Sequence, residues 1–328
     1  MKIASVLTPL SDENLALAAQ TGVETITIRY QGSKKSDWEP ALEKIRSVGL
    51  QPAAVEDAIA MENIICGTSG RDTEIRGIIT LLEIMADLEI PVLCYNFMAG
   101  TDWVRTRVDV AERGGASVTQ FNLAEIDQAV SLDDASRSLE HEVLSADSLW
   151  ENLTYFLEQV IPRAEQLGID LAMHPDDPPL ESFMGRSRIM NQVAGFQRLV
   201  ELVPSPRNGI CFCQGSFVEM GAPIPETIYL LGEHIRYVHF RDVRGTHDHF
   251  TETFHDNGPT NMVAAMRAYQ EIGFQGSIRP DHVPQLYGEH EGEPGYTQLG
   301  RLHAWGYMRG LMDAVSDDCS DASERSHE

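Results

Sequence analysis

The sequence predicts an α/β protein built as a single (β/α)8 TIM barrel over residues 1–315, with an insertion after the fourth strand. Segments with strand character alternate with segments of helical periodicity, and eight of the segments are strand-like. Parallel strands need crossover helices between them, and eight strands close into a barrel with a filled interior. The chain has 328 residues, a length at which such a barrel forms one domain.

The first half of the chain predicts four strands and their connecting helices. The strands are expected at Lys2–Thr8, Glu24–Tyr30, Gln51–Asp57 and Pro91–Phe97. Ser11 is placed to cap the first helix and Gly22 to end it, and Pro40 falls in the first turn of the second helix. A third, amphipathic helix is expected over about 71–88. The fourth strand is continuously apolar, which suits a strand buried on both faces.

A polar segment at about 103–146 interrupts this rhythm. It is too long for an ordinary connecting loop. Long insertions after a barrel strand include functional lids and interface elements. A plain surface excursion is the other interpretation, and the sequence leaves both open.

The second half predicts the remaining four strands and five helices. The strands are expected at Asp170–Asp176, Asn208–Ser216, Ile235–Val243 and Ser277–Val283. The helices are expected at Ser148–Ile169, Ser187–Val203, Pro225–His234, Asn261–Gly273 and Thr297–Val315. Residues 316–328 are acidic and poor in apolar side chains, so a disordered tail is expected there.

The charge and the cysteines bear on partners and on location. The formal net charge of −25 repels phosphate backbones and anionic headgroups, so neither nucleic-acid nor membrane binding is expected. The five cysteines are odd in number and scattered, which is not the pattern of a disulfide framework. No signal peptide or transmembrane run is predicted. We therefore expect a cytoplasmic protein with reduced thiols.

Four residues of metal-ligand type stand late in the last four strands. They are His174, Cys213, His239 and Asp281. The C-terminal ends of barrel strands meet at one mouth, so these side chains are expected to converge on a divalent ion. A thiolate with two imidazoles and a carboxylate favours a transition ion such as manganese or zinc over magnesium.

Each of these residues also has an ordinary structural interpretation. A single histidine late in a strand is commonly a hydrogen-bonded core or rim residue, and a strand cysteine is commonly a small buried apolar group. The joint occurrence of all four favours a metal site. Cys211 lies on the same strand face as Cys213 and is an alternative thiol ligand. Cys213 is preferred because it is nearer the mouth.

Several motifs resemble those of the D-mannonate dehydratases. They are YNFMAGTDWVRT, HPDDPP, NGICFCQGS, FRD after VHF, and IRPDH followed by PGY. The resemblance extends from about Val55 to Leu311. It implies a xylose-isomerase-like barrel that removes water from D-mannonate to give 2-dehydro-3-deoxy-D-gluconate in hexuronate breakdown. It also implies a bound divalent ion, most often Mn²⁺, with Fe²⁺, Co²⁺ and Zn²⁺ as alternatives, on the four ligands already identified.

The resemblance further makes His282 and Tyr296 the acid and base candidates. An ion that binds a substrate carboxylate stabilises the charge that develops when the α-proton leaves. His282 follows Asp281 on the strand end, so one side chain can face the ion and the other the substrate. The alternatives are that His282 only orients Asp281 and that Tyr296 only packs at a helix start. Which of the two is the acid stays open.

Other polar residues are expected to bind the substrate. They are Asn96, Trp103, Arg105, Arg188, Arg241 and His255. An acidic protein repels an anionic sugar acid, so the substrate needs a local cation. A guanidinium is suited to this because it donates two hydrogen bonds to a carboxylate. The chain departs from the family where FTE, with Thr251, replaces FHE. It departs also where FMGRSRI replaces FGLPRI, although Arg188 is retained.

The function predicted from the sequence is that of a metal-dependent sugar-acid hydro-lyase. Its partners are expected to be a small sugar acid and further copies of the same chain, in a homo-oligomer such as a dimer. One alternative is a metal-dependent sugar isomerase or epimerase on the same kind of barrel. The other is a sugar-acid binding protein without turnover, against which the presence of both His282 and Tyr296 argues.

Overall fold

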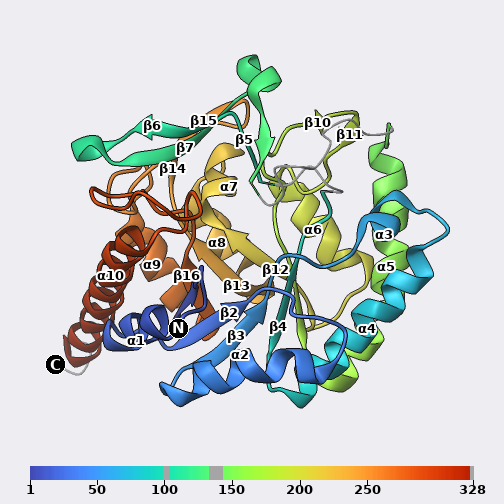
Figure 1. Ribbon diagram of the computed structural model, residues 1–328, viewed down its shortest axis with the longest axis horizontal. Coiled ribbons are helices and arrows are strands. Elements are labelled where there is room, and N and C mark those ends of the chain that lie inside the picture. Colours follow the sequence, from blue (N-terminus) through green and yellow to red (C-terminus); the bar gives the residue numbers. More distant parts are fainter. Residues whose placement is uncertain (99–102, 133–142, 326–328) are drawn as a thin grey trace.

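Eight parallel strands form a closed barrel, as the sequence predicts (Figure 1). The computed structural model describes residues 1–98, 103–132 and 143–325. The strands are β1 Lys2–Val6, β2 Thr25–Ile28, β3 Gln51–Val55, β4 Val92–Tyr95, β9 Asp170–Met173, β12 Asn208–Cys213, β13 Ile235–Phe240 and β16 Ser277–Pro280. Their order around the barrel follows the chain, and β1 pairs with β16 to close it.

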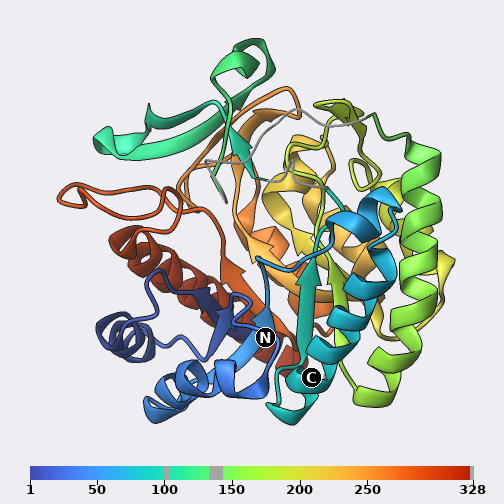
Figure 2. The same cartoon turned by 45° about the vertical axis from the view of Figure 1, so that its right-hand side comes forward.

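The helices surround this barrel (Figures 1 and 2). They are α1 Asp12–Gln20, α2 Lys35–Ser47, α3 Glu62–Cys66, α4 Arg71–Asp87, α5 Ala146–Leu167, α6 Val193–Leu202, α7 Gln214–Glu219, α8 Ile224–Leu231, α9 Met262–Glu271 and α10 Gln298–Arg325. The Ser11 hydroxyl accepts a hydrogen bond from the Asn14 amide, which confirms the predicted cap of α1. Helix α10 continues beyond residue 315, and residues 326–328 lie outside the described part of the chain.

The described part of the insertion after β4 contributes a second sheet. Its strands β6 Arg107–Ala111 and β7 Ser117–Asn122 join β14 Val243–Thr246 and β15 His249–Glu252, in the order β14-β15-β7-β6. All the pairings in this sheet are antiparallel, and Phe121 of β7 faces Phe250 of β15. A short pairing of β5 (Val104–Arg105) with β8 (Val130–Ser131) lies beside it. The insertion is thereby tied to the segment that follows β13.

The barrel interior and the insertion sheet have separate apolar cores. Small side chains such as Ala54 and Ala172 pack with Tyr237 inside the barrel. A larger cluster fills the space between the barrel and its helices. Under the insertion sheet, Phe121 packs against Phe250 and Phe183. The insertion therefore has its own apolar support.

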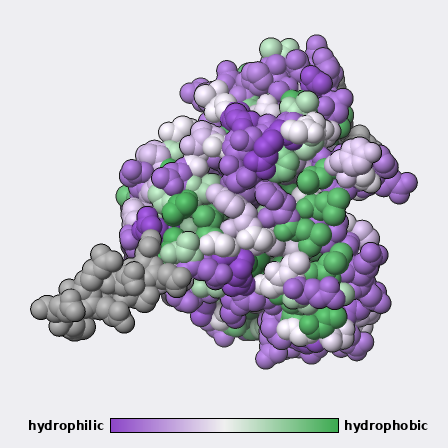
Figure 3. Space-filling view, turned by 90° about the vertical axis from the view of Figure 1, so that its left-hand side faces the viewer, coloured by the Kyte–Doolittle hydropathy of each residue, from purple (hydrophilic) through white to green (hydrophobic). Residues whose placement is uncertain are grey.

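The outer surface matches the acidic composition. The face drawn in Figure 3 is mostly hydrophilic and carries its hydrophobic side chains in separate patches. No helix in the described part of the chain is both long and apolar enough to cross a membrane.

Replacing Phe121 by alanine should loosen the insertion sheet and lower the free energy of unfolding by about 3–5 kcal/mol, because a fully buried aromatic ring is lost. The matched control is Val108→Ala on β6, where the side chain is 39% exposed and the expected change is within about 0.5 kcal/mol. Denaturant-induced unfolding measures both. An equal decrease in the free energy of unfolding for the two variants would show that the packing of Phe121 does not stabilise the insertion sheet.

Candidate active site

A cavity of about 350 Å³ opens where the barrel strands end. Seven of the twelve residues predicted for the site line it: Asn96, Trp103, His174, His239, Asp281, His282 and Tyr296. These residues come from segments that follow or end β4, β9, β13 and β16. The C-terminal ends of barrel strands therefore build this cavity, as the barrel rule predicts.

The four predicted metal ligands lie together. The donor atoms of His174, Cys213 and His239 are all within 4.8 Å of one another. Cys213 and His239 pair in register on β12 and β13, and His174 follows the last residue of β9. Asp281 brings Oδ2 to 3.8 Å from both the Cys213 sulfur and His239 Nδ1.

The thiolate form of Cys213 and the hydrogen-bonded Nδ1 of His174 suit metal binding, whereas the second proton of His174 would have to leave. The His174 Nδ1–H donates to the Pro175 carbonyl at 2.7 Å, which leaves Nε2 as the ligand atom. Burial alone would raise the pKa of the Cys213 thiol, but Arg241 and His174 outweigh it and hold the pKa well below its usual range. Burial would likewise lower the pKa of His174, yet the Cys213 thiolate raises it to about 9. A divalent ion would compete with the proton of this pair.

Asp281 supplies a second negative donor. Its pKa is held well below the usual range, since His282 and Arg279 outweigh the opposing effect of burial. Arg279 donates to Oδ1 at 2.7 Å, and Arg241 Nε lies 2.9 Å from Oδ2. A buried thiolate and a buried carboxylate beside two imidazoles fit a divalent transition ion.

The alternative thiol ligand belongs to a different group. Cys211 is fully buried and clusters with Cys94 and His239, within the same 4.8 Å. Cys213 is the cysteine that clusters with both predicted histidines. The geometry therefore favours Cys213 for the predicted set.

The two acid and base candidates stand beside this cluster. The His282 ring stacks on Trp103 with a centroid distance of 5.1 Å and an interplanar angle of 9°. Its Nδ1 lies 2.8 Å from Glu252 Oε1. The carboxylate can only accept there, so Nδ1 carries the hydrogen and Nε2 is left on the other side of the ring. Tyr296 meets the His282 ring edge-on and donates its hydroxyl to Asp281 at 3.4 Å.

Arg105 and Arg241 lie in a buried ion network and do not line the cavity. Arg105 donates two hydrogen bonds to Asp177, at 2.7 and 3.0 Å, and a third to Glu252. Arg241 reaches Asp177, Glu252 and Glu219 at 3.0–3.3 Å. Such charges are stable inside a protein because each is paired.

Arg188 and His255 also lie away from the cavity lining. Arg188 is buried beside Asp176 at 3.6 Å. Asp176 accepts a hydrogen bond from the Met190 amide at 2.7 Å, so its side chain caps the backbone of this loop. Burial lowers the pKa of His255 to about 4, and neither ring nitrogen has a hydrogen-bond partner among the described residues.

Thr251 lies in the insertion sheet rather than in the cavity lining. Its hydroxyl accepts a hydrogen bond from the Gln120 side chain of β7 at 2.9 Å. The departure from the FHE pattern therefore lies at a contact between β15 and β7. The neighbouring Glu252 carries the contact to His282.

Sequence reasoning missed two acids of the ion network, Glu252 and Glu219. Glu252 had a readable signal, because the alternation of β15 places it on the same face as the buried Phe250. Glu219 ends the short helix α7 and is 1% exposed, and no sequence pattern marks it. Glu56 also lines the cavity and pairs with Arg279 at 2.9 Å.

The sequence matches a family of known enzymes. The family model described as D-mannonate dehydratase (UxuA) matches residues 19–321. The mannonate dehydratase of Oceanobacillus iheyensis is 33% identical over 291 residues, which cover 83% of each chain. Mannonate dehydratase 2 of Halalkalibacterium halodurans is 34% identical over 290 residues, covering 82% of this chain and 84% of the relative.

Solved structures agree with this assignment. The crystal structure of mannonate dehydratase from Streptococcus suis serotype 2 superimposes with a TM-score of 0.87 at 26% identity, covering 97% of this chain and 96% of that one. An L-ribulose 3-epimerase superimposes with a TM-score of 0.65 at 14% identity over 98% of each chain, which shows a shared fold alone. The barrel, the family match and the identity to these relatives lead to one conclusion: the chain belongs to the D-mannonate dehydratase family.

Proposed function

We propose that this protein catalyses the metal-dependent dehydration of D-mannonate to 2-dehydro-3-deoxy-D-gluconate. The observation that carries the proposal is the clustering of the donor atoms of His174, Cys213, His239 and Asp281 in a chain of this family. All of these but Cys213 line the cavity, and His282 lines it beside them. The reaction removes the proton next to the carboxylate and releases the neighbouring hydroxyl as water. It therefore needs a local positive charge and two proton-transfer groups.

The four clustered side chains are proposed to hold a divalent ion, with Mn²⁺ as the preferred metal. A bound divalent ion would supply the positive charge that stabilises the substrate carboxylate as its α-proton leaves. The one guanidinium among the described residues that line the cavity is that of Arg279, and both Glu56 and Asp281 already neutralise it. This pairing supports a metal as the partner of an anionic substrate.

Trp103 and Asn96 are proposed to position the sugar chain. Both line the cavity beside His174. The indole N–H of Trp103 is buried and has no acceptor among the described residues, so it can donate to a substrate hydroxyl. Burying a donor without a partner is costly, and a bound polyol would remove that cost.

His282 and Tyr296 are proposed to move the two protons. Glu252 holds the Nδ1–H of His282, and Trp103 fixes the plane of its ring. The Nε2 atom, which lies 3.8 Å from Asp281 Oδ1, can then accept the α-proton, as a neutral imidazole does in general-base catalysis. Tyr296 has a hydroxyl hydrogen to donate and lies against Asp281, so it supplies the departing hydroxyl with a proton.

Further properties are proposed alongside the reaction. A cytoplasmic location is supported by the four described cysteines, which are thiols rather than disulfides. A homodimer would cover exposed apolar side chains such as Tyr229 and Leu230 of α8. The barrel and its insertion are proposed to form one domain over residues 1–315.

Purified protein supplied with Mn²⁺ should form a 2-keto-3-deoxy acid from D-mannonate, and chelation should abolish product formation until Mn²⁺ is restored. The measurement is a panel of aldonates, with product detected by its keto group. Neutral ketoses serve as the control, because turnover of these alone would favour an epimerase. The absence of product from every aldonate would rule out the dehydratase proposal.

Cys213→Ser should lower bound metal and turnover together, since the thiolate ligand is lost from a buried cluster. Metal content is measured by elemental analysis after removal of unbound ions. Cys66→Ser is the matched control, because Cys66 is half-buried on α3 and lies outside the cluster. Unchanged metal content in Cys213→Ser would point to Cys211 or to another ligand set.

His282→Asn should lower kcat by about 10²–10⁴-fold, the usual contribution of a general acid or base. Metal content should stay at the level of the unmodified protein, because His282 is proposed to face the substrate. Steady-state kinetics and metal analysis of the same preparation test both. A parallel fall in metal content would instead assign His282 to orienting Asp281.

A further inference from the structure

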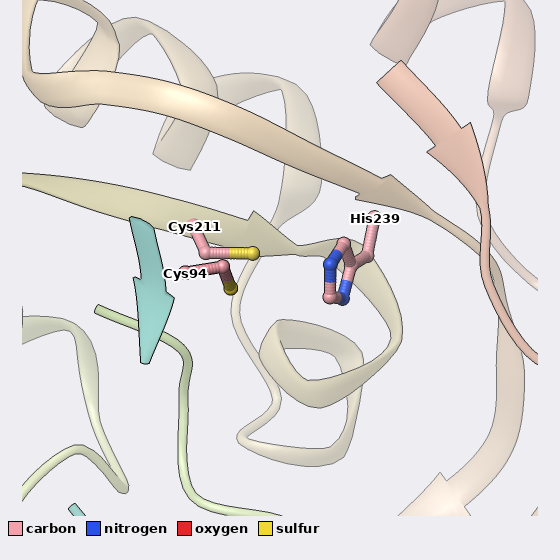
Figure 4. Close-up of side chains that lie close together, drawn as sticks. All are labelled: Cys94, Cys211 and His239. Atoms are coloured by element: carbon pink, nitrogen blue, oxygen red, sulfur yellow. The ribbon is translucent and has the colours of Figure 1, made fainter. Parts of the chain in front are cut away.

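A second group of metal-binding side chains lies beside the first and deeper in the barrel. The donor atoms of Cys94, Cys211 and His239 are all within 4.8 Å of one another. Figure 4 shows both thiols on the same side of the His239 imidazole, with Cys211 pointing toward the ring. Each of the three residues is at most 2% exposed. Cys211 precedes Cys213 by two residues on β12, so this group lies further from the strand ends.

The two thiols are badly placed for a disulfide. Cys94 is on β4 and Cys211 is on β12, and β9 lies between these strands. Neighbouring strands are about 4.8 Å apart, which puts the two Cα atoms roughly 9 Å from each other. A disulfide needs a Cα separation below about 7 Å. The two sulfurs themselves lie within 4.8 Å of each other. Two metal–sulfur bonds of about 2.3 Å each can span a sulfur–sulfur distance close to that limit.

An ion can reach this group from the mouth of the barrel. Cys94 and His239 both line the cavity that opens there. Glu56 lines it as well and brings Oε1 to 3.1 Å from His239 Nε2. Glu56 Oε2 is buried without a hydrogen-bond partner among the described residues. That oxygen is available to complete the coordination or to orient the imidazole.

We propose that Cys94, Cys211 and His239 form a second metal site that takes a thiophilic divalent ion such as Zn²⁺ or Cd²⁺. Two thiolates and one imidazole are the ligands that such ions prefer. The first group offers one thiolate with the harder carboxylate of Asp281. Because both groups use His239, an ion at the thiol site changes the imidazole available to the first site. The binding site itself does not depend on the dehydratase function.

The test isolates the two thiols by removing the others. The chain has five cysteines, so replacing Cys66, Cys213 and Cys319 by alanine leaves only this pair. Chelator-treated, full-length protein of this variant is titrated with Cd²⁺, and thiolate-to-metal charge-transfer absorption is followed. We expect a band that saturates at one equivalent of Cd²⁺. Adding C94A or C211A should reduce the band and weaken Cd²⁺ binding by more than about 10-fold.

Two outcomes would overturn the proposal: Cd²⁺ binding without the charge-transfer band, or a band and an affinity unchanged by C94A and C211A. Alanine suits the buried positions because the thiols pack among small side chains such as Ala54 and Ala172. Cadmium-edge X-ray absorption of the unmodified protein is the second measurement. It should show two or more sulfur ligands per ion, and one or none would refute the site. Neither measurement uses substrate, so a failure here is distinguishable from a failure of the dehydratase proposal.

Discussion

The candidate site depends on the ion pairs between the buried Arg241 guanidinium and the carboxylates around it. This guanidinium is 1% exposed and lies within 3.3 Å of four carboxylates: Asp177, Glu219, Glu252 and Asp281. Removing one partner from a buried ion network leaves an uncompensated charge, which is strongly unfavourable. Gly215 shows how tightly the backbone fits, because a Cβ there would lie 2.5 Å from the Arg241 guanidinium. The glycine of the CQGS segment therefore makes room for this charge.

Arg241 also connects the predicted metal ligands with the acid–base candidate His282. Through Asp281 it contacts the predicted metal ligands, and through Glu252 it contacts the carboxylate that holds His282. Glu252 reaches this position because β15 is paired with β7, so the sheet formed with the insertion sets one wall of the site. The insertion adds Arg105 to the same network and Trp103 to the ring stack. The sequence left two interpretations of the insertion open, a functional lid and a plain surface excursion. Its described part corresponds to neither, because it forms a fixed wall of the site.

The barrel and the strand-end residues could be predicted because both follow from local rules. The hydrophobic periodicity and the helix caps predict where the strands and helices lie. The ends of barrel strands meet at one mouth, and this rule brings His174, His239 and Asp281 together. The ion pairs could not be predicted, since they depend on long-range geometry. Arg105 and Arg241 are expected from the sequence to bind the substrate, yet only the folded structure shows that carboxylates surround both. For the same reason the partner of His282 was missed, although the alternation of β15 places Glu252 on a buried face.

The choice between the two thiols of β12 shows what a strand period of two leaves open. Cys211 and Cys213 share one face, so periodicity alone gives both to the barrel interior. The structure separates them by depth: Cys213 lies with Asp281 near the mouth, and Cys211 lies with Cys94 below it. A carboxylate suits a harder ion, whereas a second thiolate suits a softer one. His239 is common to both groups, so the chemical hardness of the ion, rather than the imidazole, decides which group is the better match.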